Sequence, residues 1–241
     1  MGDSVLWTKP KKPIGKLKVG GSIWFKVGGV DTEFTIVQQG LPTDASGTAS
    51  TLYDKSCKGT WLLMKSIAKT DQLNANNVNN YSKGYLHTYL NTISDINALS
   101  KLYFLDFLEE NVRNAIIEQN AKIPYVAGNG KGSVSSGANG LSVKCFLLSA
   151  KEVGFSNAPN GDDLHNDGVL LDYFKTDATT KRATSMNWWT RSPAKGWTDM
   201  MIMSYENGTV GVINSNLFAG IRPAFILPSD FDTTDYTVSV Q

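Results

Sequence analysis

Residues 187–193, with the sequence NWWTRSP, decide the fold of this chain, and a second motif, GIRPAF, follows at residues 220–225. Trp188 and Trp189 of the first motif each carry a large apolar surface, which is costly to leave in water. We therefore expect both tryptophans to lie in the core.

Each motif also carries one arginine, Arg191 in the first and Arg222 in the second. A guanidinium group offers five donors in a fixed fork, which suits backbone carbonyl groups or a carboxylate. We expect the two arginines and the two tryptophans to form a rigid framework of the fold. Residues 194–219 between the motifs can then vary in chemistry, a layout typical of a display scaffold rather than of a catalytic cleft.

The composition is typical of a soluble globular protein, with 241 residues of which 41% are hydrophobic. This length suits one large domain or two small ones and can bury a substantial core. No run of about 18 apolar residues occurs, so we expect no membrane insertion. The first seven residues, MGDSVLW, lack the apolar centre of a signal peptide, which predicts synthesis in the cytoplasm without standard secretion.

Only two cysteines occur, Cys57 and Cys145, and neither has metal-like spacing. Cys145 lies inside the apolar run VKCFLL, residues 143–148. Since a free cysteine in such a run usually behaves as a small hydrophobic residue, we expect a buried thiol there.

The charge of +1 is unevenly distributed along the chain. Residues 1–18 carry a local charge of +4, so the remaining 223 residues carry −3. We predict an extended basic arm over residues 1–16, a single domain over residues 17–229 and an acidic tail over residues 230–241. Arm and tail could dock onto neighbouring copies or partners, or be solvated ends. The basic stretch has no accompanying aromatic or glycine pattern, so nucleic acid is not an expected partner.

The pattern of apolar residues predicts strands at both ends of the chain and helices in the middle. Strands are expected at residues 22–27, 33–37, 60–64, 224–227 and 236–240, and around Phe146. Helices are expected after residues 80–82, over residues 105–117, and as short pieces at residues 149–153 and 170–174. Leu105, Leu108, Val112, Ala115 and Ile116 would share one helix face. Long glycine-rich loops are expected at residues 40–56 and 128–140.

Residues 200–215 form the clearest predicted hairpin, because Asn207-Gly208 favours a two-residue type I′ turn. One face would then carry Met201, Met203, Tyr205, Val210 and Val212. The other face would carry Met200, Ile202, Ser204, Glu206, Thr209, Ile213 and Ser215. One apolar and one mixed face predict a sheet covered on one side. The mixed face, together with the charged ends, favours self-association, for which closed symmetry is usual.

The chain offers little for catalysis. Its two histidines, His87 and His165, lie in different segments, and His87 is expected to be a partly buried structural residue on a helix. The acidic loop at residues 160–168 resembles the start of a calcium loop, but position twelve is Phe174 instead of a bidentate Glu. A solvated turn is the default interpretation and metal binding the alternative. We expect no catalytic residues, no metal and no cofactor.

Together, the motifs resemble those of a known domain family. The pattern WWxRSP with GIRPA resembles the C-terminal signature of a domain family of uncharacterised function that is frequent in phages and prophages of Gram-positive bacteria. Further matches lie upstream: GTWLLM (59–64), IPY (123–125), SGANGLS (136–142) and LLSAxEVG (147–154). The resemblance covers roughly residues 17–229.

The signature is also similar to the C-type-lectin-like fold of formylglycine-generating enzymes and of phage tropism proteins with variable surfaces. This resemblance implies an α+β fold with mixed and antiparallel sheets, two or more helices and long glycine-rich loops. It also implies a display window at residues 194–218, with candidate ligand contacts at Lys195, Trp197, Asp199, Asn214, Asn216 and Phe218. The calcium-binding Glu-Pro-Asn of sugar-binding lectins is absent, and the paired catalytic cysteines of the enzymes are not matched.

Three functions remain as hypotheses. The first is a non-enzymatic structural protein on the exterior of a phage virion, as a capsid or tail decoration or in the host-contact apparatus, with other virion proteins and its own copies as partners. The second is a receptor-binding module for a host-surface carbohydrate or protein, with Trp197 as a stacking platform. The third is an enzyme, which would need a reactive, low-pKa thiol at Cys145.

Overall fold

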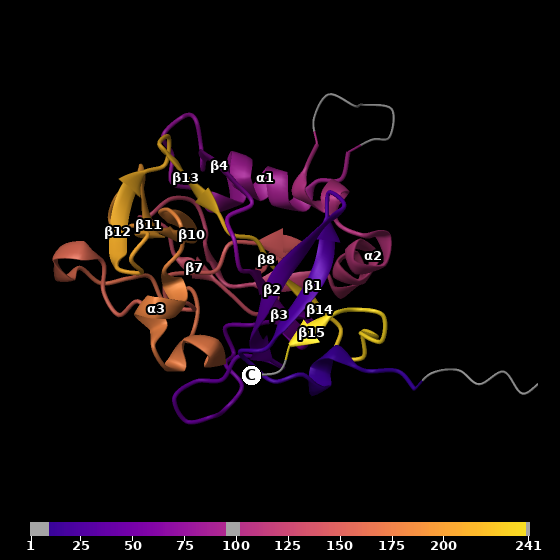
Figure 1. Cartoon of the computed structure of the whole chain (residues 1–241). Helices are drawn as coiled ribbons and strands as arrows, with labels where there is room; N and C mark the ends of the chain where they lie inside the picture. Colours follow the sequence, from indigo (N-terminus) through magenta and orange to yellow (C-terminus); the bar gives the residue numbers. More distant parts are fainter. Residues whose placement is uncertain (1–9, 95–101, 240–241) are drawn as a thin grey trace, which may run out of the picture.

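The computed structural model describes residues 10–94 and 102–239 and shows an α+β protein in which strands predominate (Figure 1). Most of the strands belong to two sheets. The first sheet has the strand order β15-β1-β2-β3-β14-β9: β15 (Val238–Ser239), β1 (Ser22–Val27), β2 (Val30–Gln39), β3 (Thr60–Met64), β14 (Ala224–Leu227) and β9 (Cys145–Phe146). The second has the order β12-β11-β10-β13-β4: β12 (Val210–Asn214), β11 (Met200–Ser204), β10 (Trp188–Pro193), β13 (Phe218–Ile221) and β4 (Lys69–Gln72).

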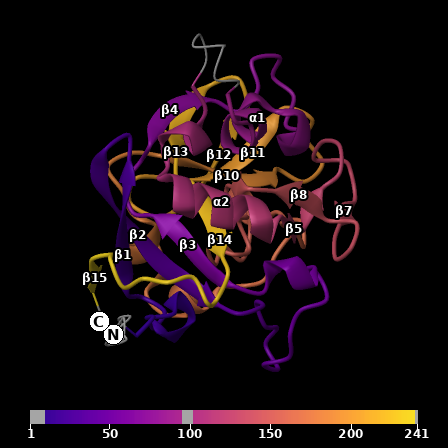
Figure 2. The same ribbon diagram turned by 90° about the vertical axis from the view of Figure 1, so that its right-hand side faces the viewer.

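Smaller elements surround these sheets. Two short ribbons pair β5 (Ala121–Ile123) with β8 (Leu141–Val143) and β6 (Tyr125–Val126) with β7 (Val134–Ser135). The α-helices are α1 (Tyr85–Asn91), α2 (Glu110–Gln119) and α3 (Ala178–Arg182), and α2 packs against β14 of the first sheet (Figure 2). Single 3-10 turns occur at η1 (Ile14–Lys16), η2 (Lys55–Cys57), η3 (Tyr81–Lys83), η4 (Phe104–Phe107), η5 (Pro159–Gly161) and η6 (Asp172–Lys175).

The two sequence motifs join the sheets to each other. The first motif forms β10, the central strand of the second sheet, and the second runs from β13 in that sheet to β14 in the first. Because successive side chains of a strand point to opposite faces, the adjacent tryptophans fill different cores. Trp189 lies in the cluster with Phe25 and Phe225, and Trp188 lies in the cluster with Trp61.

The predicted helix at residues 105–117 is interrupted. The structure has η4, then extended backbone at Leu108 and Glu109, then α2. Leu108 forms a β-bridge with Val27 at the end of β1, and this pairing prevents a continuous helix. The five apolar residues predicted for one helix face therefore do not share a helix, since Leu105 and Leu108 precede α2. Leu105, Leu108, Val112 and Ile116 are nevertheless buried, and Ala115 is partly buried. The expected short helix at residues 149–153 is a turn, whereas part of the stretch at residues 170–174 forms η6.

The hairpin at residues 200–215 exists, but its predicted register is wrong. Tyr205 donates its N–H to the carbonyl of Thr209 over 2.8 Å, so the loop has three residues instead of two. Gly208 closes this loop with φ of 82°, as in a turn followed by a left-handed residue. The extra residue places Val210 opposite Ser204 and Val212 opposite Ile202. A shift of one residue moves every side chain of a strand to the other face.

The second sheet is therefore covered on both faces, which corrects the prediction of one covered face. Met201 and Ile213 belong to one core cluster, while Ile202, Val210 and Val212 belong to the other. Since Ile202 is fully buried, the mixed face that favoured self-association does not exist as predicted.

The arm and the tail lie against each other within one molecule. The N–H of Ile14 donates to the carbonyl of Phe231 over 2.9 Å, and the N–H of Thr233 donates to the carbonyl of Lys12 over 2.8 Å. Ile14 is fully buried, and Phe231 and Tyr236 pack on Phe25. Part of each end thus belongs to the fold, whereas docking onto partners or exposure to solvent was expected. Residues 1–9 of the arm, and Val240 of the predicted last strand, lie outside the described residues.

Candidate functional site

The candidate site is built on the loop that leaves β10 and returns as β11. Its closing contact is the hydrogen bond from the N–H of Ala194 to the carbonyl of Met200, at 2.8 Å. Inside it, the N–H of Trp197 donates to the carbonyl of Ala194 and the N–H of Gly196 to the carbonyl of Gly130. The loop is therefore held both by its own strands and by the distant glycine-rich segment.

Asn79 fastens the same loop from the other side. Its fully buried amide donates to the carbonyls of Trp197, at 3.1 Å, and Met200, at 2.7 Å. The amide oxygen of Asn79 accepts the N–H of Gly130 at 3.0 Å. Gly130 is required here, because a Cβ atom would lie 2.0 Å from the carbonyl oxygen of Ala194. We call this arrangement of Asn79, Gly130 and the loop the Asn79 latch.

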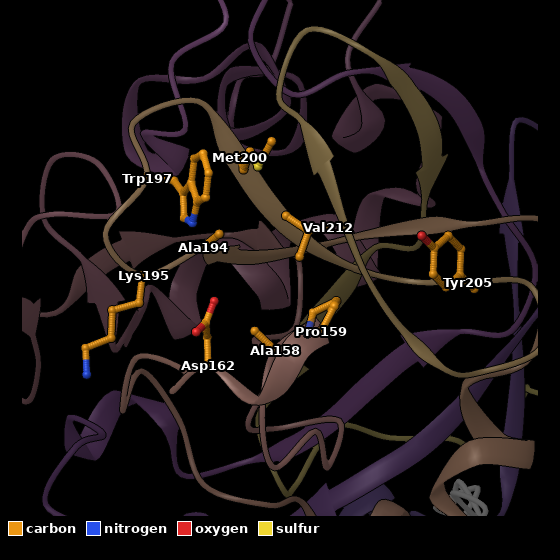
Figure 3. A pocket seen from close by; sticks show the side chains of 9 residues that line it. All are labelled: Ala158, Pro159, Asp162, Ala194, Lys195, Trp197, Met200, Tyr205 and Val212. Carbon is orange, nitrogen blue, oxygen red and sulfur yellow. The ribbon is translucent and has the colours of Figure 1, made fainter.

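An open groove of about 360 Å³ lies beside the latched loop, at the small end of the usual range for ligand sites. It is lined by Ala158, Pro159, Asp162, Ala194, Lys195, Trp197, Met200, Tyr205 and Val212. Figure 3 shows Trp197 and Tyr205 at opposite ends, with Met200 and Val212 between them. The two aromatic residues are 50% and 40% exposed, so each presents part of its ring to a ligand.

Charged groups lie at one side of this groove. Lys195 and Asp162 both line it, and the Nζ atom of Lys195 lies 3.6 Å from a carboxylate oxygen of Asp163. The side chains of Lys195 and Asp163 are 51% and 83% exposed, so water screens this pair and it contributes little to stability. The groove therefore combines an apolar floor with a few polar groups, the pattern of a binding site.

The six predicted contact residues divide into two groups. Lys195 and Trp197 line the groove, whereas Asp199, Asn214, Asn216 and Phe218 do not. The latter four lie where β11 begins and where β12 turns into β13. There the carbonyl of Asp199 accepts the N–H of Ser215, and that of Asn216 accepts from the side chain of Gln72. Phe218 is 65% exposed at the start of β13.

The structure buries all four framework residues, and Arg191 uses all five of its donors. Two go to the carboxylate of Glu152, each at 2.6 Å. The other three go to the carbonyls of Pro124, Leu147 and Asp167. Burial acts to lower the pKa of Arg191, but the Glu152 carboxylate outweighs it and the net shift is upward. The charged pair therefore holds four segments of the chain together, at Pro124, residues 147–152, Asp167 and Arg191.

Arg222 ties the other motif in place. Its Nε atom donates to the carbonyl of Met64 over 2.8 Å, and its guanidinium lies 5.2 Å from the centre of the Trp188 ring. Burial lowers the pKa of Arg222 to about 10. Cation–π contact and a backbone acceptor together stabilise the charge in this buried position.

The carboxyl group of Asp167, which lies near Arg191, is unusual because it is buried and only partly hydrogen-bonded. Its Oδ2 atom accepts the hydroxyl of Ser192 at 2.7 Å, while its Oδ1 atom is buried with no hydrogen-bond partner among the described residues. Burial raises the pKa of Asp167 to about 6, and the nearby Arg191 limits the rise. The carboxyl group can therefore change charge close to neutral pH.

The acidic and histidine residues of the loop that resembles a calcium site lie in different environments. Asp163 is exposed, Asp167 is buried on Ser192, and His165 donates from Nε2 to the carbonyl of Gly130 at 3.0 Å. No group of three or more His, Cys, Asp or Glu side chains that could hold a metal occurs within residues 10–94 and 102–239. His87 is partly buried on α1, as predicted, and burial lowers its pKa.

Both cysteines are buried, which confirms the prediction for Cys145. Burial raises the pKa of the Cys145 thiol, and it raises that of Cys57 to about 12. A reactive thiol would need a lowered pKa. The raised pKa of Cys145 is the opposite of the lowered pKa that the enzyme hypothesis requires of this thiol. Cys57 does not supply such a thiol either.

Several groove residues were not among the predicted contacts. Tyr205, Met200 and Val212 lie inside the predicted window but were assigned only to hairpin faces. Asp162 was weighed only as part of a metal loop. Asn79 carried no signal, because a single asparagine in an asparagine-rich segment does not reveal which distant loop it bonds.

Comparison with known proteins gives one finding. A family model described as a domain of unknown function (DUF6273) matches residues 58–229. No curated protein and no solved structure matches the chain. In the part of the chain that the structure describes, every helix is too short or too polar to cross a membrane.

Proposed function

This chain belongs to the DUF6273 family of unknown function, and we propose that it is a non-enzymatic recognition domain that binds its ligand in the groove between Trp197 and Tyr205. The observation that carries this proposal is that the backbone of the groove loop is held by hydrogen bonds, whereas its aromatic side chain is exposed. The loop that carries Trp197 is fastened by the Asn79 latch, while the Trp197 ring remains half exposed. A rigid loop that presents aromatic rings loses little entropy on binding.

The setting that we propose is the exterior of a phage particle, and the proposed fold likeness is to C-type-lectin-like domains. Both rest on the resemblance of the two motifs to phage and prophage proteins. The arrangement of the motifs supports the likeness, since both framework arginines are buried and the segment between them carries the groove. Other virion proteins and the host surface are the partners that this setting implies.

Binding of purified, fluorescently labelled protein to cells of the encoding bacterium tests the recognition role. Trp197→Ala should reduce binding at least tenfold without lowering the melting temperature by more than about 2 °C. The matched control is Phe218→Ala, which removes a still more exposed aromatic ring outside the groove, 65% against 50% for Trp197, and should leave binding unchanged. Equal binding by the wild type and Trp197→Ala would refute the proposed site.

A structural role in the virion is the second candidate, supported by the same resemblance. Quantitative mass spectrometry of purified particles distinguishes the two roles. A copy number comparable to that of the major capsid or tail-tube protein would indicate decoration, with recognition secondary. A few copies per particle would indicate the host-contact apparatus. Absence from the particles would exclude a virion component.

A further inference from the structure

β12 is an edge strand of the second sheet, and its residue Val212 lines the groove. The hydrogen bonds from Tyr205 to Thr209 and from Ser215 to Asp199 fix which residues pair through the backbone. In an antiparallel ladder, hydrogen-bonded and non-hydrogen-bonded pairs alternate. Val210 and Val212 therefore fall at non-hydrogen-bonded positions opposite Ser204 and Ile202. Their N–H and C=O groups point away from β11, toward the edge.

No strand among the described residues pairs with this outer edge. Natural sheets protect such edges with charged residues or proline. β12 has the sequence VGVIN, which contains neither. Val210 and Val212 are only partly buried, and Val212 also lines the groove opposite Pro159 and Asp162. η5 packs against β12, and Pro159 of η5 lines the groove together with Val212, but in the described part of the chain no hydrogen bond joins η5 to the outward N–H and C=O groups of Val210 and Val212. These backbone groups are thus available to a ligand beside the groove.

We propose, on the basis of the recognition role argued above, that the ligand is an extended polypeptide segment. It pairs with the outer edge of β12 as an added strand and places a large apolar side chain in the groove. This mode of recognition uses backbone hydrogen bonds for affinity and side-chain pockets for specificity.

The spacing of the edge groups selects this ligand over a glycan. Val210 and Val212 each offer one donor and one acceptor, and two residues of a strand span about 7 Å. An extended peptide presents complementary groups at the same repeat, whereas sugar hydroxyls do not alternate in this way. The floor of Met200, Val212 and Ala158 is apolar and suits the side chain that a strand presents at every second residue.

The test uses the purified protein and a displayed library of random linear 12-residue peptides. Selection is for binding to the wild type, with Val212→Pro as the counter-selection target. Proline removes the outward N–H of Val212 but no ladder hydrogen bond, and it keeps an apolar side chain at the groove. Val210→Lys is the second variant, since a charge on the edge should oppose strand addition without a backbone change.

We expect selected peptides to carry apolar residues at alternate positions and to bind Val212→Pro and Val210→Lys at least tenfold more weakly than the wild type. Hydrogen exchange at the amides of Val210 and Val212 should slow when a peptide binds. The inference is overturned if no peptide is enriched over the counter-selection, or if enriched peptides leave both amides exchanging at the rate of the unbound protein.

The cell-binding assay separates this inference from the recognition role. If Val212→Pro binds cells as the wild type does while Trp197→Ala does not, the groove is the recognition site but its ligand is not an added strand. If neither change alters cell binding, the recognition role itself fails.

Discussion

At the scale of single residues, the buried ion pair of Arg191 and Glu152 joins the strand that leads into the groove loop to three other segments of the chain. Both side chains are fully buried, and Glu152 also accepts hydrogen bonds from the hydroxyl of Tyr53 and the N–H of Ser149. A buried pair that is complete in this way adds little net stability over an apolar core, but it is very sensitive to the loss of one partner. Its role is to fix which segments meet.

Removing the charge of Glu152 should therefore be strongly destabilising. Glu152→Gln removes the carboxylate that is hydrogen-bonded to Arg191 and leaves Asp167, whose carboxylate does not bond the guanidinium, as the nearby acid. We expect a loss of about 3–5 kcal/mol in the free energy of unfolding. The control is Lys65→Met, which breaks the exposed pair with Glu33 and should cost under about 1 kcal/mol. Urea unfolding at pH 7 measures both. Similar losses for the two variants would contradict this assignment.

Asp167 predicts a pH dependence with an unusual sign. Its pKa rises from 3.8 to about 6 on folding, so the folded protein binds its proton more tightly than the unfolded chain. Ionisation of Asp167 therefore lowers stability as the pH rises from about 4 to about 6, by about 3 kcal/mol in total. Asp167→Asn lacks this effect, so its stability relative to the wild type should increase by up to that amount between pH 4 and pH 7.5. A pH-independent difference between the two unfolding free energies would contradict the prediction.

At the scale of elements, the hairpin of β11 and β12 shows what local sequence can and cannot predict. Asn207-Gly208 correctly indicated the turn, but the same dipeptide fits a two-residue loop and a three-residue loop. The choice depends on distant contacts. Arg182 donates from Nε to the carbonyl of Gly208 over 2.8 Å, and Gly208 packs on α3. The register, and with it the position of Val212 in the groove, follows from this tertiary contact.

Gly208→Ala tests that contact. A Cβ atom at Gly208 would lie 1.9 Å from the carbonyl oxygen of Thr179, in addition to the strain of φ at 82°. Gly47 has φ of 81° with open space around it, so Gly47→Ala reports the backbone strain alone, about 1–2 kcal/mol. We expect Gly208→Ala to cost at least about 2 kcal/mol more than Gly47→Ala in urea unfolding. Equal costs would mean that α3 does not constrain the turn.

At the scale of the whole molecule, the fold class, the buried framework and most of the core could be predicted from the sequence, because apolar patterning is a local property. The groove could not be, since it joins Asp162, Trp197 and Tyr205 from two segments whose proximity depends on packing. The same limit applies to the termini. Their opposite charges suggested contacts with partners, whereas the structure pairs parts of the two ends by backbone hydrogen bonds within one molecule.

The contacts between arm and tail predict that Phe231 and Tyr236 stabilise the fold, whereas the exposed acids Asp230 and Asp235 contribute little. A Phe231→Ala,Tyr236→Ala double variant should lose on the order of 2–4 kcal/mol, because each partly buried ring contributes about 1–2 kcal/mol. Asp230→Asn,Asp235→Asn should change the free energy of unfolding by less than about 0.5 kcal/mol, as is usual for exposed sites. A larger effect of the charge variant than of the ring variant would contradict the packing seen at Phe25.

The most direct test of the central claim is to block the groove chemically. Because Cys57 and Cys145 are buried, Lys195→Cys introduces a single accessible thiol at the groove, and Phe218→Cys places one on the same display window outside it. Cell binding of each variant is measured before and after labelling with a bulky maleimide. We predict that labelling at position 195 abolishes binding and that labelling at position 218 leaves it intact. Binding that survives the label at position 195 would contradict the assignment of the groove as the recognition site.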